Sequence, residues 1–430
     1  MAAKELKTLL KKIPGLRSFG RNMKEMVKDV QAIGNFLAER KVPRGTDPIK
    51  VGFLCQYIPI WHKLQPIYEM MLEDPRFEPV LICVPSGIQD SVLDPNSNAD
   101  DTYEYFRTHG YSEAMNALQA DGSWLDLEQL GLTYIFYPRP YDHFMPQPYW
   151  CKQVSRYCKI CLILYGMNVT EEITKITLHR SFYRYVYCYF AEMPFSRDVN
   201  ARNGWIAHAL GFQQSVYYGM PGIEAILASR DQKSAAWDFS KNDFRVMWTP
   251  RWTTDLSCGG SNFFTYYRVL IDLARERPDM DFLFRPHPLA IAHFLETGEL
   301  TQEEADWFYD QCRQLPNISL DSQKEYTDTL WGTSVLITDI SGLMPEYFAT
   351  GKPMIFCASN MILTPERSTR KMLEVTYIAH NREELLQYLS QLRCGIDPLA
   401  ERRRTVVQEL FPEAECHPAH QIVEHLAKHS

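Results

Sequence analysis

The stretch that most constrains the fold is residues 335–357, which read V-L-I-T-D-I-S-G-L-M-P-E-Y-F-A-T-G-K-P-M-I-F-C. A short apolar, β-branched run opens it, a polar turn with a glycine interrupts that run, and a second apolar run closes it. Pro345 stands where the first turn of a helix tolerates proline. This order predicts a strand, a helix that begins at about Ser341 and a second strand, which together form a βαβ unit of a parallel sheet.

The turn inside this unit is a candidate site for an anion. The first turn of the expected helix leaves backbone N–H groups unpaired, and the positive end of its macrodipole lies just outside the carboxyl end of a strand. Open α/β sheets hold phosphates at such positions. The alternative is that Asp339 or Ser341 only caps the helix.

A second strand end strengthens the first interpretation. Residues 281–288 read D-F-L-F-R-P-H-P, a short apolar strand that stops abruptly at Arg285 and His287 between two prolines. Because parallel strands end at the same edge of a sheet, we expect both side chains to lie near the turn of residues 338–342. Two strand ends with converging polar groups are harder to explain as capping.

The distribution of charge says more than its total. The formal net charge of −8 gives no indication of a nucleic-acid partner. Residues 1–44, however, carry eleven Lys or Arg and four Asp or Glu, so the rest of the chain is acidic.

With 45% hydrophobic residues, the 430-residue chain is long enough for two domains of roughly 200 residues each.

The basic N-terminal segment reads as two amphipathic helices separated by Pro14 and Gly15. Such a segment fits an anionic membrane surface, and a helix packed on the body of the protein or in a homodimer contact is the alternative. The second helix has the pattern of a core-facing helix. The apolar faces consist of Leu6, Leu9, Leu10 and Ile13 in the first helix, and of Met23, Met26, Val27, Val30, Ile33 and Leu37 in the second.

The eleven cysteines show no framework spacing, and lysines interrupt any apolar leader segment, so we expect reduced thiols in a cytoplasmic protein. Cys158 and Cys161 form a C-x-x-C, but Cys161 opens an apolar run, which favours a buried strand over a metal site. We therefore expect no metal and no cofactor. No run of 18 apolar residues is present, so we expect no membrane span.

The alternation of strands and helices predicts an α/β protein with two doubly wound, Rossmann-like domains that face each other across a cleft. This architecture suits a transferase with a nucleotide-activated donor. We expect a helical extension at 1–45, an N-terminal acceptor domain at 46–235, a C-terminal nucleotide-donor domain at 236–405, and a last helical segment at 406–430 that crosses back to the first domain.

The second domain resembles the CDP-glycerol glycerophosphotransferase family, which are GT-B enzymes that build teichoic-acid-type polymers. The resemblance rests on T-P-R-W-T-T-D (residues 249–255), R-P-H-P (285–288), T-D-I-S-G-L-M-P-E-Y (338–347) and G-K-P-M-I-F (351–356). It is good over residues 240–360 and loose over 49–221. The family's S-D-Y-S-S has Gly342 at its last serine here, and Glu346 and Tyr347 fill the later acidic and aromatic positions.

The resemblance implies a CDP-activated donor whose diphosphate lies at the helix after Asp339. Ser341, Gly342 and the adjacent N–H groups would bind phosphate oxygens, and Glu346 a ribose or polyol hydroxyl. Asp339 would orient the turn, because a carboxylate repels phosphate. The side chains expected to neutralise charge on the phosphates or the leaving nucleotide are Arg251, Arg285 and His287.

One departure concerns the catalytic base. Polymerases of the family carry a histidine in an H-G turn of the first domain, and the similar turn here is Tyr165 and Gly166. A phenol is a poor base at neutral pH. We predict His62, after the first strand of the acceptor domain, as the substitute, with His143 as second choice; His143 and Tyr165 would line the acceptor cleft.

The predicted function is transfer of a glycerol-phosphate or similar polyol-phosphate unit from a CDP donor to a cell-surface polymer or its lipid-linked precursor. Two alternatives stay open: a GT-B glycosyltransferase of capsule or surface-polysaccharide synthesis that uses a nucleotide sugar, and a non-catalytic nucleotide-binding scaffold. We expect a cytoplasmic protein, peripheral on the inner face of a bacterial plasma membrane through residues 1–40. The sequence does not decide between a monomer and a homo-oligomer.

Overall fold

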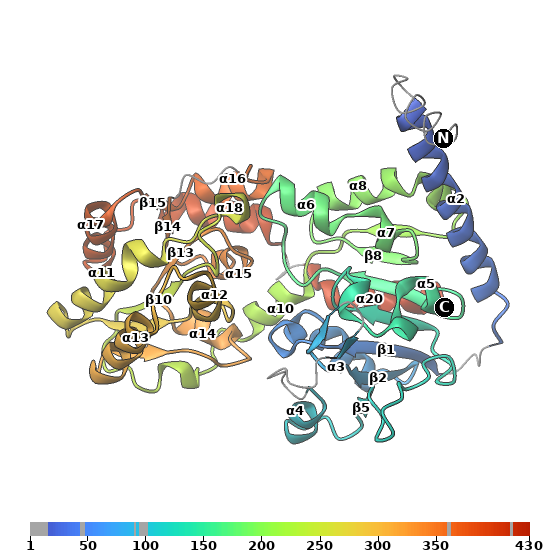
Figure 1. Ribbon diagram of the computed structural model, residues 1–430, viewed down its shortest axis with the longest axis horizontal. Coiled ribbons are helices and arrows are strands. Elements are labelled where there is room, and N and C mark those ends of the chain that lie inside the picture. The colour runs from blue at the N-terminus through green and yellow to red at the C-terminus, as the bar shows by residue number, and fades with distance from the viewer. Residues whose placement is uncertain (1–15, 44–47, 90–91, 94–101, 359–362, 413–415) are drawn as a thin grey trace, which may run out of the picture.

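The computed structural model describes residues 16–43, 48–89, 92–93, 102–358, 363–412 and 416–430. It contains two separate parallel sheets, each covered by helices, which lie side by side along the long axis of the molecule (Figure 1). Each sheet is formed by one half of the chain. The predicted α/β class with two doubly wound, Rossmann-like domains is confirmed.

In the first domain, the described residues form a seven-stranded sheet in the order β5-β2-β1-β6-β7-β8-β9. A short antiparallel pair, β3 and β4, lies within residues 88–93. The strands are β1 Ile49–Cys55, β2 Phe77–Cys83, β3 Ile88–Gln89, β4 Val92–Leu93, β5 Met115–Asn116, β6 Tyr134–Tyr137, β7 Lys159–Ile163, β8 Cys188–Phe190 and β9 Gln214–Val216. The helices are α3 Gln65–Glu73, α4 Thr102–Thr108, α5 Cys151–Val154, α6 Glu171–Thr177, α7 Arg180–Tyr183, α8 Pro194–Asn203, α9 Trp205–Ala209 and α10 Pro221–Ala228, with short 3-10 turns η1 Ile58–Lys63, η2 Asp142–Phe144 and η3 Gln147–Tyr149.

The second domain has a six-stranded sheet in the order β12-β11-β10-β13-β14-β15, all pairs parallel. Its strands are fully buried runs of four or five residues at the centre, the pattern of a sheet covered on both faces. The strands are β10 Arg245–Thr249, β11 Asp281–Phe284, β12 Ile318–Leu320, β13 Val335–Thr338, β14 Met354–Cys357 and β15 Tyr377–Ala379. The helices are α11 Phe263–Glu276, α12 Ala290–Thr297, α13 Gln302–Gln314, α14 Thr327–Gly332, α15 Leu343–Phe348, α16 Arg367–Leu373, α17 Arg382–Arg393 and α18 Ala400–Leu410, with 3-10 turns η4 Ala235–Trp237 and η5 Leu256–Cys258.

The predicted βαβ unit is present as β13, α15 and β14. Helix α15 begins at Leu343 rather than at Ser341, with Gly342 as its N-cap residue. The backbone already turns at Ser341, because its carbonyl accepts the Met344 N–H at 3.3 Å. The start of the helix was therefore predicted two residues early.

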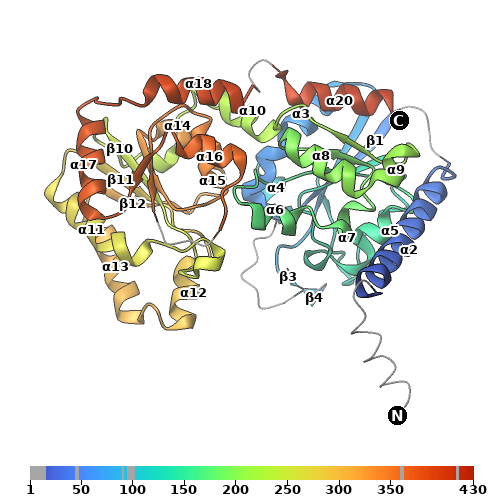
Figure 2. The same cartoon turned by 90° about the horizontal axis from the view of Figure 1, so that it is seen from above.

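The C-terminal helix α20, Pro418–Lys428, lies on the first domain, although the preceding helix α18 lies on the second (Figure 2). It buries Ile422, Val423 and Leu426 in the core beneath β1 and β6, and Tyr134 Oη donates to the Leu426 carbonyl at 3.1 Å. Between the last strand of the first sheet and the first strand of the second lie residues 217–244. The domain limits at 235 and 236 remain a prediction.

The attachment of α20 gives a testable pH dependence. His425 is 6% exposed and forms a hydrogen bond with Tyr218 Oη at 2.9 Å, and burial, with smaller effects of His429 and Lys428, lowers the pKa of His425 to about 4. An unfolded histidine titrates near 6.5, so the unfolded state binds more protons between pH 6.5 and 4, and stability falls as the pH drops through that window. The free energy of unfolding should therefore fall less on acidification in His425→Gln than in the native protein, by about 2 kcal/mol. Urea unfolding at pH 6.5 and 4.5 checks this, and an equal loss in both proteins would contradict it.

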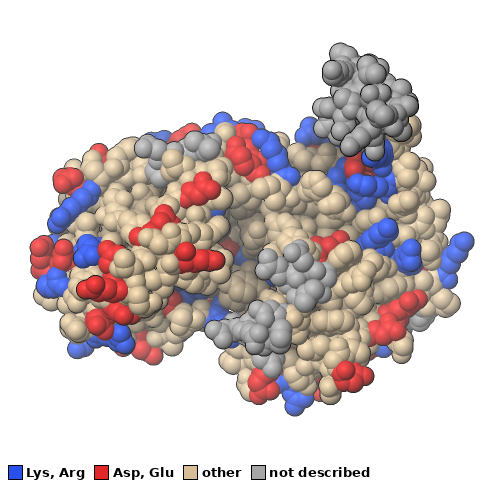
Figure 3. All heavy atoms as spheres, viewed as in Figure 1, with Lys and Arg blue, Asp and Glu red and all other residues tan. Residues whose placement is uncertain are grey.

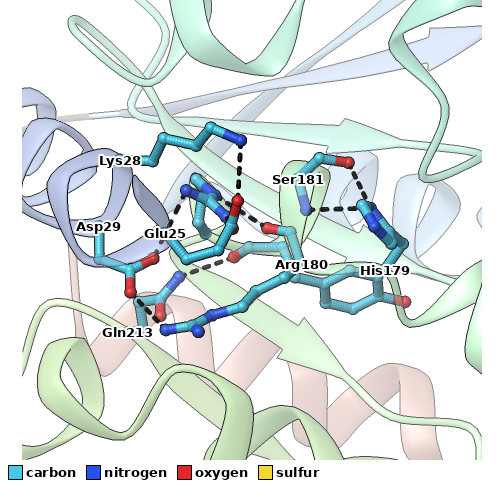
Figure 4. Close-up of polar contacts among 9 residues, drawn as sticks. Glu25, Lys28, Asp29, His179, Arg180, Ser181 and Gln213 are labelled. Carbon is cyan, nitrogen blue, oxygen red and sulfur yellow. Dashed lines mark hydrogen bonds and ion pairs between the residues drawn. The ribbon is translucent and has the colours of Figure 1, made fainter. Parts of the chain in front are cut away.

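Helix α2, Leu16–Glu39, lies along the outer side of the first domain (Figures 1 and 2). Its contacts to the body include ion pairs: Arg180 pairs with Asp29 (Figure 4). Arg184 pairs with Glu25 and Asp29. A hydrogen bond from Lys28 and the charge of Arg184 lower the pKa of Glu25 to about 2. Farther along, Ala32 and Phe36 are buried, and Phe36 stacks on Phe212 with ring centroids 6.0 Å apart.

The buried face of α2 differs from the one that the hydrophobic pattern indicated. The apolar residues expected to face the core are mostly exposed, because two acidic residues find arginine partners on α7 and just beyond it and thereby fix the rotation of the helix. The exposed residues are Met23, Met26, Val27, Val30 and Leu37, at 47–62% exposure, and we call them the apolar stripe. The first predicted helix, residues 6–13, lies outside the described residues. Within the described parts of the chain, no helix has the length and apolarity needed to cross a membrane.

Candidate active site

The surface is hollowed between the two domains (Figure 3). Contacts between the domains border it. Tyr105 Oη donates to Glu325 at 2.9 Å, and Thr170 and Pro365 form an antiparallel β-bridge. These contacts join the segments after β2 and β7 to the segments after β12 and β14, and an ion pair between Lys63 and Glu346 joins the turn after β1 to α15.

Asp339 organises the second domain's side of this cleft. It is 2% exposed, and its Oδ2 accepts the backbone N–H groups of Arg251 at 2.9 Å and Asn262 at 3.2 Å, while Oδ1 accepts Asn262 Nδ2 at 2.8 Å. Burial raises the pKa of Asp339, against the opposing effect of these hydrogen bonds. The carboxylate thus joins the ends of β10 and β13 to the start of α11. This geometry agrees with an orienting role and leaves no oxygen turned toward a donor phosphate.

Arg251 projects from this support. Its Nη1 donates to the Ile340 carbonyl at 2.6 Å, and its Nε is buried without a hydrogen-bond partner. Burial lowers the pKa of Arg251, which nevertheless stays a cation at neutral pH. Gly259, with φ of +108°, packs against it, and a Cβ there would come within 2.4 Å of Ile340 Cγ2. Asp339 is the carboxylate that interacts electrostatically with Arg251, and the unpartnered Nε leaves room for a hydrogen bond to a further anion.

His287 lies beside Arg251. Its backbone N–H donates to the Pro250 carbonyl at 3.1 Å, and its Nδ1 accepts the Leu289 N–H at 3.2 Å. Loss of hydration and then the charge of Arg251 lower the pKa of His287 to about 4. The imidazole is therefore neutral at pH 7, and its proton is on Nε2, which is left as a donor. His287 can donate a hydrogen bond to a phosphate oxygen, whereas the charge on this side of the cleft comes from Arg251.

The turn before α15 is held by fewer side-chain contacts than Arg251 and His287. Ser341 is half-buried, with its Oγ 3.4 Å from Thr338 Oγ1, and Gly342 is exposed. A Cβ at Gly342 would meet no atom within 4 Å, and its φ of −65° suits any residue. The glycine that replaces the family's serine is thus no steric requirement of the fold.

Arg285 is already occupied. Its Nη1 donates to Asp321 at 2.5 Å, its Nη2 to the Gln323 carbonyl at 2.9 Å, and its guanidinium lies 4.7 Å from the centre of the Tyr326 ring. These contacts give it a clear structural role in placing Tyr326. The predicted contact with a phosphate would have to use a guanidinium N–H that does not already donate to Asp321 or to the Gln323 carbonyl.

Glu346 reaches the other domain. It is 3% exposed, forms a buried ion pair with Lys63 of η1, and accepts the Tyr326 hydroxyl at 2.6 Å. Both carboxylate oxygens are therefore engaged by protein groups, and the predicted bond to a ribose or polyol hydroxyl would have to displace one of them. The pair Lys63–Glu346 links the end of β1 to α15 across the domain boundary.

His62 lies next to this pair. Its Nδ1 is 3.0 Å from the Pro59 carbonyl, and its Nε2 is buried without a hydrogen-bond partner, 3.9 Å from Glu346. Burial and the charge of Lys63 keep the pKa of His62 well below its usual range. Nε2 is thus the unprotonated nitrogen, as a base requires, but the ring is 9% exposed and packs edge-on against Tyr326.

The other two predicted residues lie at neighbouring strand ends. His143, in η2 after β6, is exposed and lies 4.1 Å from the Phe144 ring. Tyr165, after β7, has its hydroxyl 3.5 Å from that of Tyr141. The ring of Tyr141 is 5.7 Å from His143, so the two predicted acceptor residues share one aromatic neighbour.

Sequence reasoning did not single out Lys63, Arg139, Asn262 or Tyr326. Lys63 directly follows His62, and Arg139 lies four residues before His143, so each is close to a histidine that the sequence analysis did name. Asn262 and Tyr326 had no local signal, because each functions through a partner distant in sequence. Among the described residues, no group of three or more His, Cys, Asp or Glu is placed to hold a metal ion, and Cys161 is buried in β7.

Comparison with known protein families identifies the chain. The model of the family CDP-glycerol:poly(glycerophosphate) glycerophosphotransferase matches residues 171–428, which is more than half of the sequence. The chain belongs to this family. The predicted transferase activity is confirmed by this membership, with a donor of the CDP-glycerol type and a polymeric acceptor. No curated protein matches the chain.

Solved structures support the GT-B fold. The wall teichoic acid polymerase TagF, soaked with CDPG, has a TM-score of 0.52 and 14% identity over 97% of this chain and 98% of that one. UDP-GlcNAc 2-epimerase from Neisseria meningitidis, bound to UDP-GlcNAc, has a TM-score of 0.58 and 14% identity over 88% of this chain and 100% of that one. The S. aureus MnaA–UDP structure has a TM-score of 0.54 and 14% identity over 88% and 96%. At these identities the likeness establishes the fold alone.

Proposed function

We propose that this family member transfers a glycerol-phosphate or similar polyol-phosphate unit from a CDP-activated donor to a cell-surface polymer or its lipid-linked precursor. The observation that carries the proposal is the pair Arg251 and His287 beside the turn before α15: a buried cation whose Nε has no partner and a neutral imidazole with a free donor. Together they fit a diphosphate. TagF, which shares this fold, was soaked with CDPG, and this supports a donor of the same class.

In the proposed reaction a hydroxyl oxygen of the acceptor forms a bond to the glycerol-bearing phosphorus, and the bond from that phosphorus to the bridging oxygen breaks. CMP leaves with that oxygen, and the hydroxyl proton passes to a base. Arg251 and His287 stabilise negative charge that increases on the leaving nucleotide, a role that in other enzymes is worth about 3 kcal/mol per donor. Ser341 and the backbone before α15 would hold the transferred phosphoryl oxygens.

Access favours His143 over His62 as the base. His143 is exposed at the end of β6 beside the aromatic group of Tyr141 and Tyr165, whereas His62 is buried between Tyr326 and Glu346. A general base must come within hydrogen-bond distance of the acceptor hydroxyl. We therefore expect His143→Ala to lose turnover by about two orders of magnitude and His62→Ala mainly to lose stability. CMP release and urea unfolding measure the two effects. Loss of turnover in His62→Ala, with turnover retained in His143→Ala, would assign the role of base to His62.

The donor class is tested first by calorimetry with the purified chain. We expect CDP-glycerol to bind at least tenfold more tightly than UDP- or GDP-sugars, since the proposal places a cytidine donor in the second domain. Tighter binding of a nucleotide sugar would favour the glycosyltransferase alternative. An absence of binding by all three donors would contradict the proposed site.

We further propose that the N-terminal segment, residues 1–40, holds the protein on the inner face of a bacterial plasma membrane, where a lipid-linked acceptor would be found. The support is the apolar stripe of α2, which is exposed along the outer side of the first domain with Lys24 and Lys28 beside it. Burial of this stripe in a lipid interface and attraction of the lysines to anionic lipid, about 1 kcal/mol each, would act together.

A double substitution in the stripe tests the membrane proposal. We expect Met26→Glu/Val30→Glu to reduce sedimentation with phosphatidylglycerol vesicles by at least tenfold, because both the apolar area and the electrostatic attraction decrease. Ile176→Glu is the matched control, since Ile176 is 63% exposed on α6 of the same domain. Unchanged sedimentation of the double variant, or equal loss in the control, would argue against a membrane role for α2.

A further inference from the structure

Arg139 is a second arginine of the cleft, and it comes from the first domain. It follows β6 directly, where Pro138 and Pro140 fix the backbone on both sides. Its Nη2 donates to Gln56 Oε1, and its guanidinium lies 4.8 Å from the centre of the Phe144 ring. Gln56 is itself fully buried, with its Nε2 donating to the carbonyls of Pro85 and Phe144. The arginine is therefore held in one orientation by a rigid support.

No carboxylate compensates this cation. Among the described residues, Arg139 has one side-chain hydrogen bond, to a neutral amide, and no ion pair with a carboxylate; the groups that interact with it electrostatically are tyrosines and a cysteine. Its Nε is buried without a partner, and burial lowers the pKa of Arg139, although an arginine remains charged at neutral pH. Arg139 is half-buried, and a partly desolvated guanidinium without an anionic partner is costly in the free protein; an anionic ligand would offset that cost.

The tyrosines around Arg139 place it toward the middle of the cleft. The groups whose charge interacts with it include the phenols of Tyr57, Tyr141 and Tyr165. Tyr165 also interacts electrostatically with Arg251 from the opposite wall. Arg139 and Arg251, each with an unpartnered Nε, thus belong to different domains and share Tyr165 as a common neighbour.

We propose that Arg139 is the acceptor-side phosphate clamp: its guanidinium binds a phosphodiester of a polyol-phosphate acceptor and places the terminal hydroxyl of that acceptor opposite the donor held by Arg251 and His287. This inference rests on the proposed function. It assigns Arg139 to the acceptor because the donor diphosphate is placed on the second domain, whereas Arg139 is fixed to the first. The planar guanidinium suits the two free oxygens of a phosphodiester, which an ammonium would bind less specifically.

The test measures binding to the full-length chain by calorimetry. The probes are a synthetic tri(glycerol phosphate), uncharged triglycerol and CDP-glycerol. For Arg139→Gln we expect affinity for the tri(glycerol phosphate) to fall about 10- to 100-fold, with CDP-glycerol affinity changed less than twofold. Arg139→Lys should give an intermediate loss. Arg156→Ala is the matched control, an exposed arginine of the same domain, and should bind all probes as the native protein does.

The outcomes separate this inference from the proposed function. Triglycerol should bind at least tenfold more weakly than the phosphate oligomer to the native chain, a comparison that needs no variant and so does not depend on whether the substitutions fold. Equal binding of the two, or equal oligomer binding by Arg139→Gln and Arg156→Ala, would overturn the clamp. An equal loss of CDP-glycerol affinity in Arg139→Gln would place the residue in the donor site and overturn it too. Arg139-dependent oligomer binding without any binding or turnover of CDP-glycerol would instead keep the clamp and reject the proposed donor.

Discussion

His287→Ala is expected to lower turnover of CDP-glycerol by about two to three orders of magnitude while the protein stays folded. The imidazole is neutral, with Nδ1 engaged by the Leu289 N–H, so the substitution removes one positioned Nε2–H donor and no buried charge. The loss should appear in kcat more than in KM, because charge on the leaving nucleotide is greatest in the transition state.

CMP release measured at saturating donor and acceptor checks this. His287→Gln should recover part of the activity, since an amide can also donate a hydrogen bond. His380→Ala is the control: His380 is exposed in the same domain, where it pairs with Glu384. Native turnover by His287→Ala, with unchanged urea unfolding, would remove His287 from the donor site.

Glu346→Gln is expected to destabilise the protein by about 3–5 kcal/mol, the largest effect on stability that the structure indicates. The substitution keeps the acceptor oxygen for Tyr326 but leaves Lys63, which is 3% exposed, without its anionic partner. Burial lowers the pKa of Lys63 to about 7. Loss of the carboxylate lowers the pKa of Lys63 further in the variant, so the unfolded chain holds more protons than the folded one from that pKa up to 10.5, and stability rises with pH through that window.

Urea unfolding of the variant from pH 7 to 9 measures both effects. The double variant Lys63→Met/Glu346→Gln should recover most of the lost stability, because it removes the unpaired charge and fills the same space. A single variant as stable as the native protein, or a double variant less stable than the single, would mean that the pair contributes little to holding the domains together.

The periodicity of the chain was sufficient to predict the second domain. Residues 335–357 form β13, α15 and β14, and residues 281–284 form β11, because apolar runs of four residues between turn signals have few other solutions in a parallel sheet. The convergence of Arg251, Asp339 and His287 also follows from topology, since β10, β11 and β13 are neighbours and end at the same edge.

The sequence did not indicate which residues pair when they are far apart along the chain. The hydrophobic pattern of α2 pointed to the wrong face, because Glu25 and Asp29 are attracted to Arg180 and Arg184, and more than 150 residues of chain separate the two groups. Lys63 and Glu346 are 283 residues apart, and nothing local to either indicates the other. Arg139 lies just after β6. Only the absence of a carboxylate partner among the described residues distinguishes it from an ordinary surface arginine.

The central claim, a polyol-phosphate transfer at the cleft between the two domains, is tested most directly by incubating the purified protein with CDP-glycerol and a lipid-linked glycerol-phosphate oligomer. The account predicts release of one CMP for each glycerol phosphate added to the oligomer, with both products lost together in Arg251→Ala. Turnover of a nucleotide sugar under the same conditions, with CDP-glycerol left intact, would contradict it.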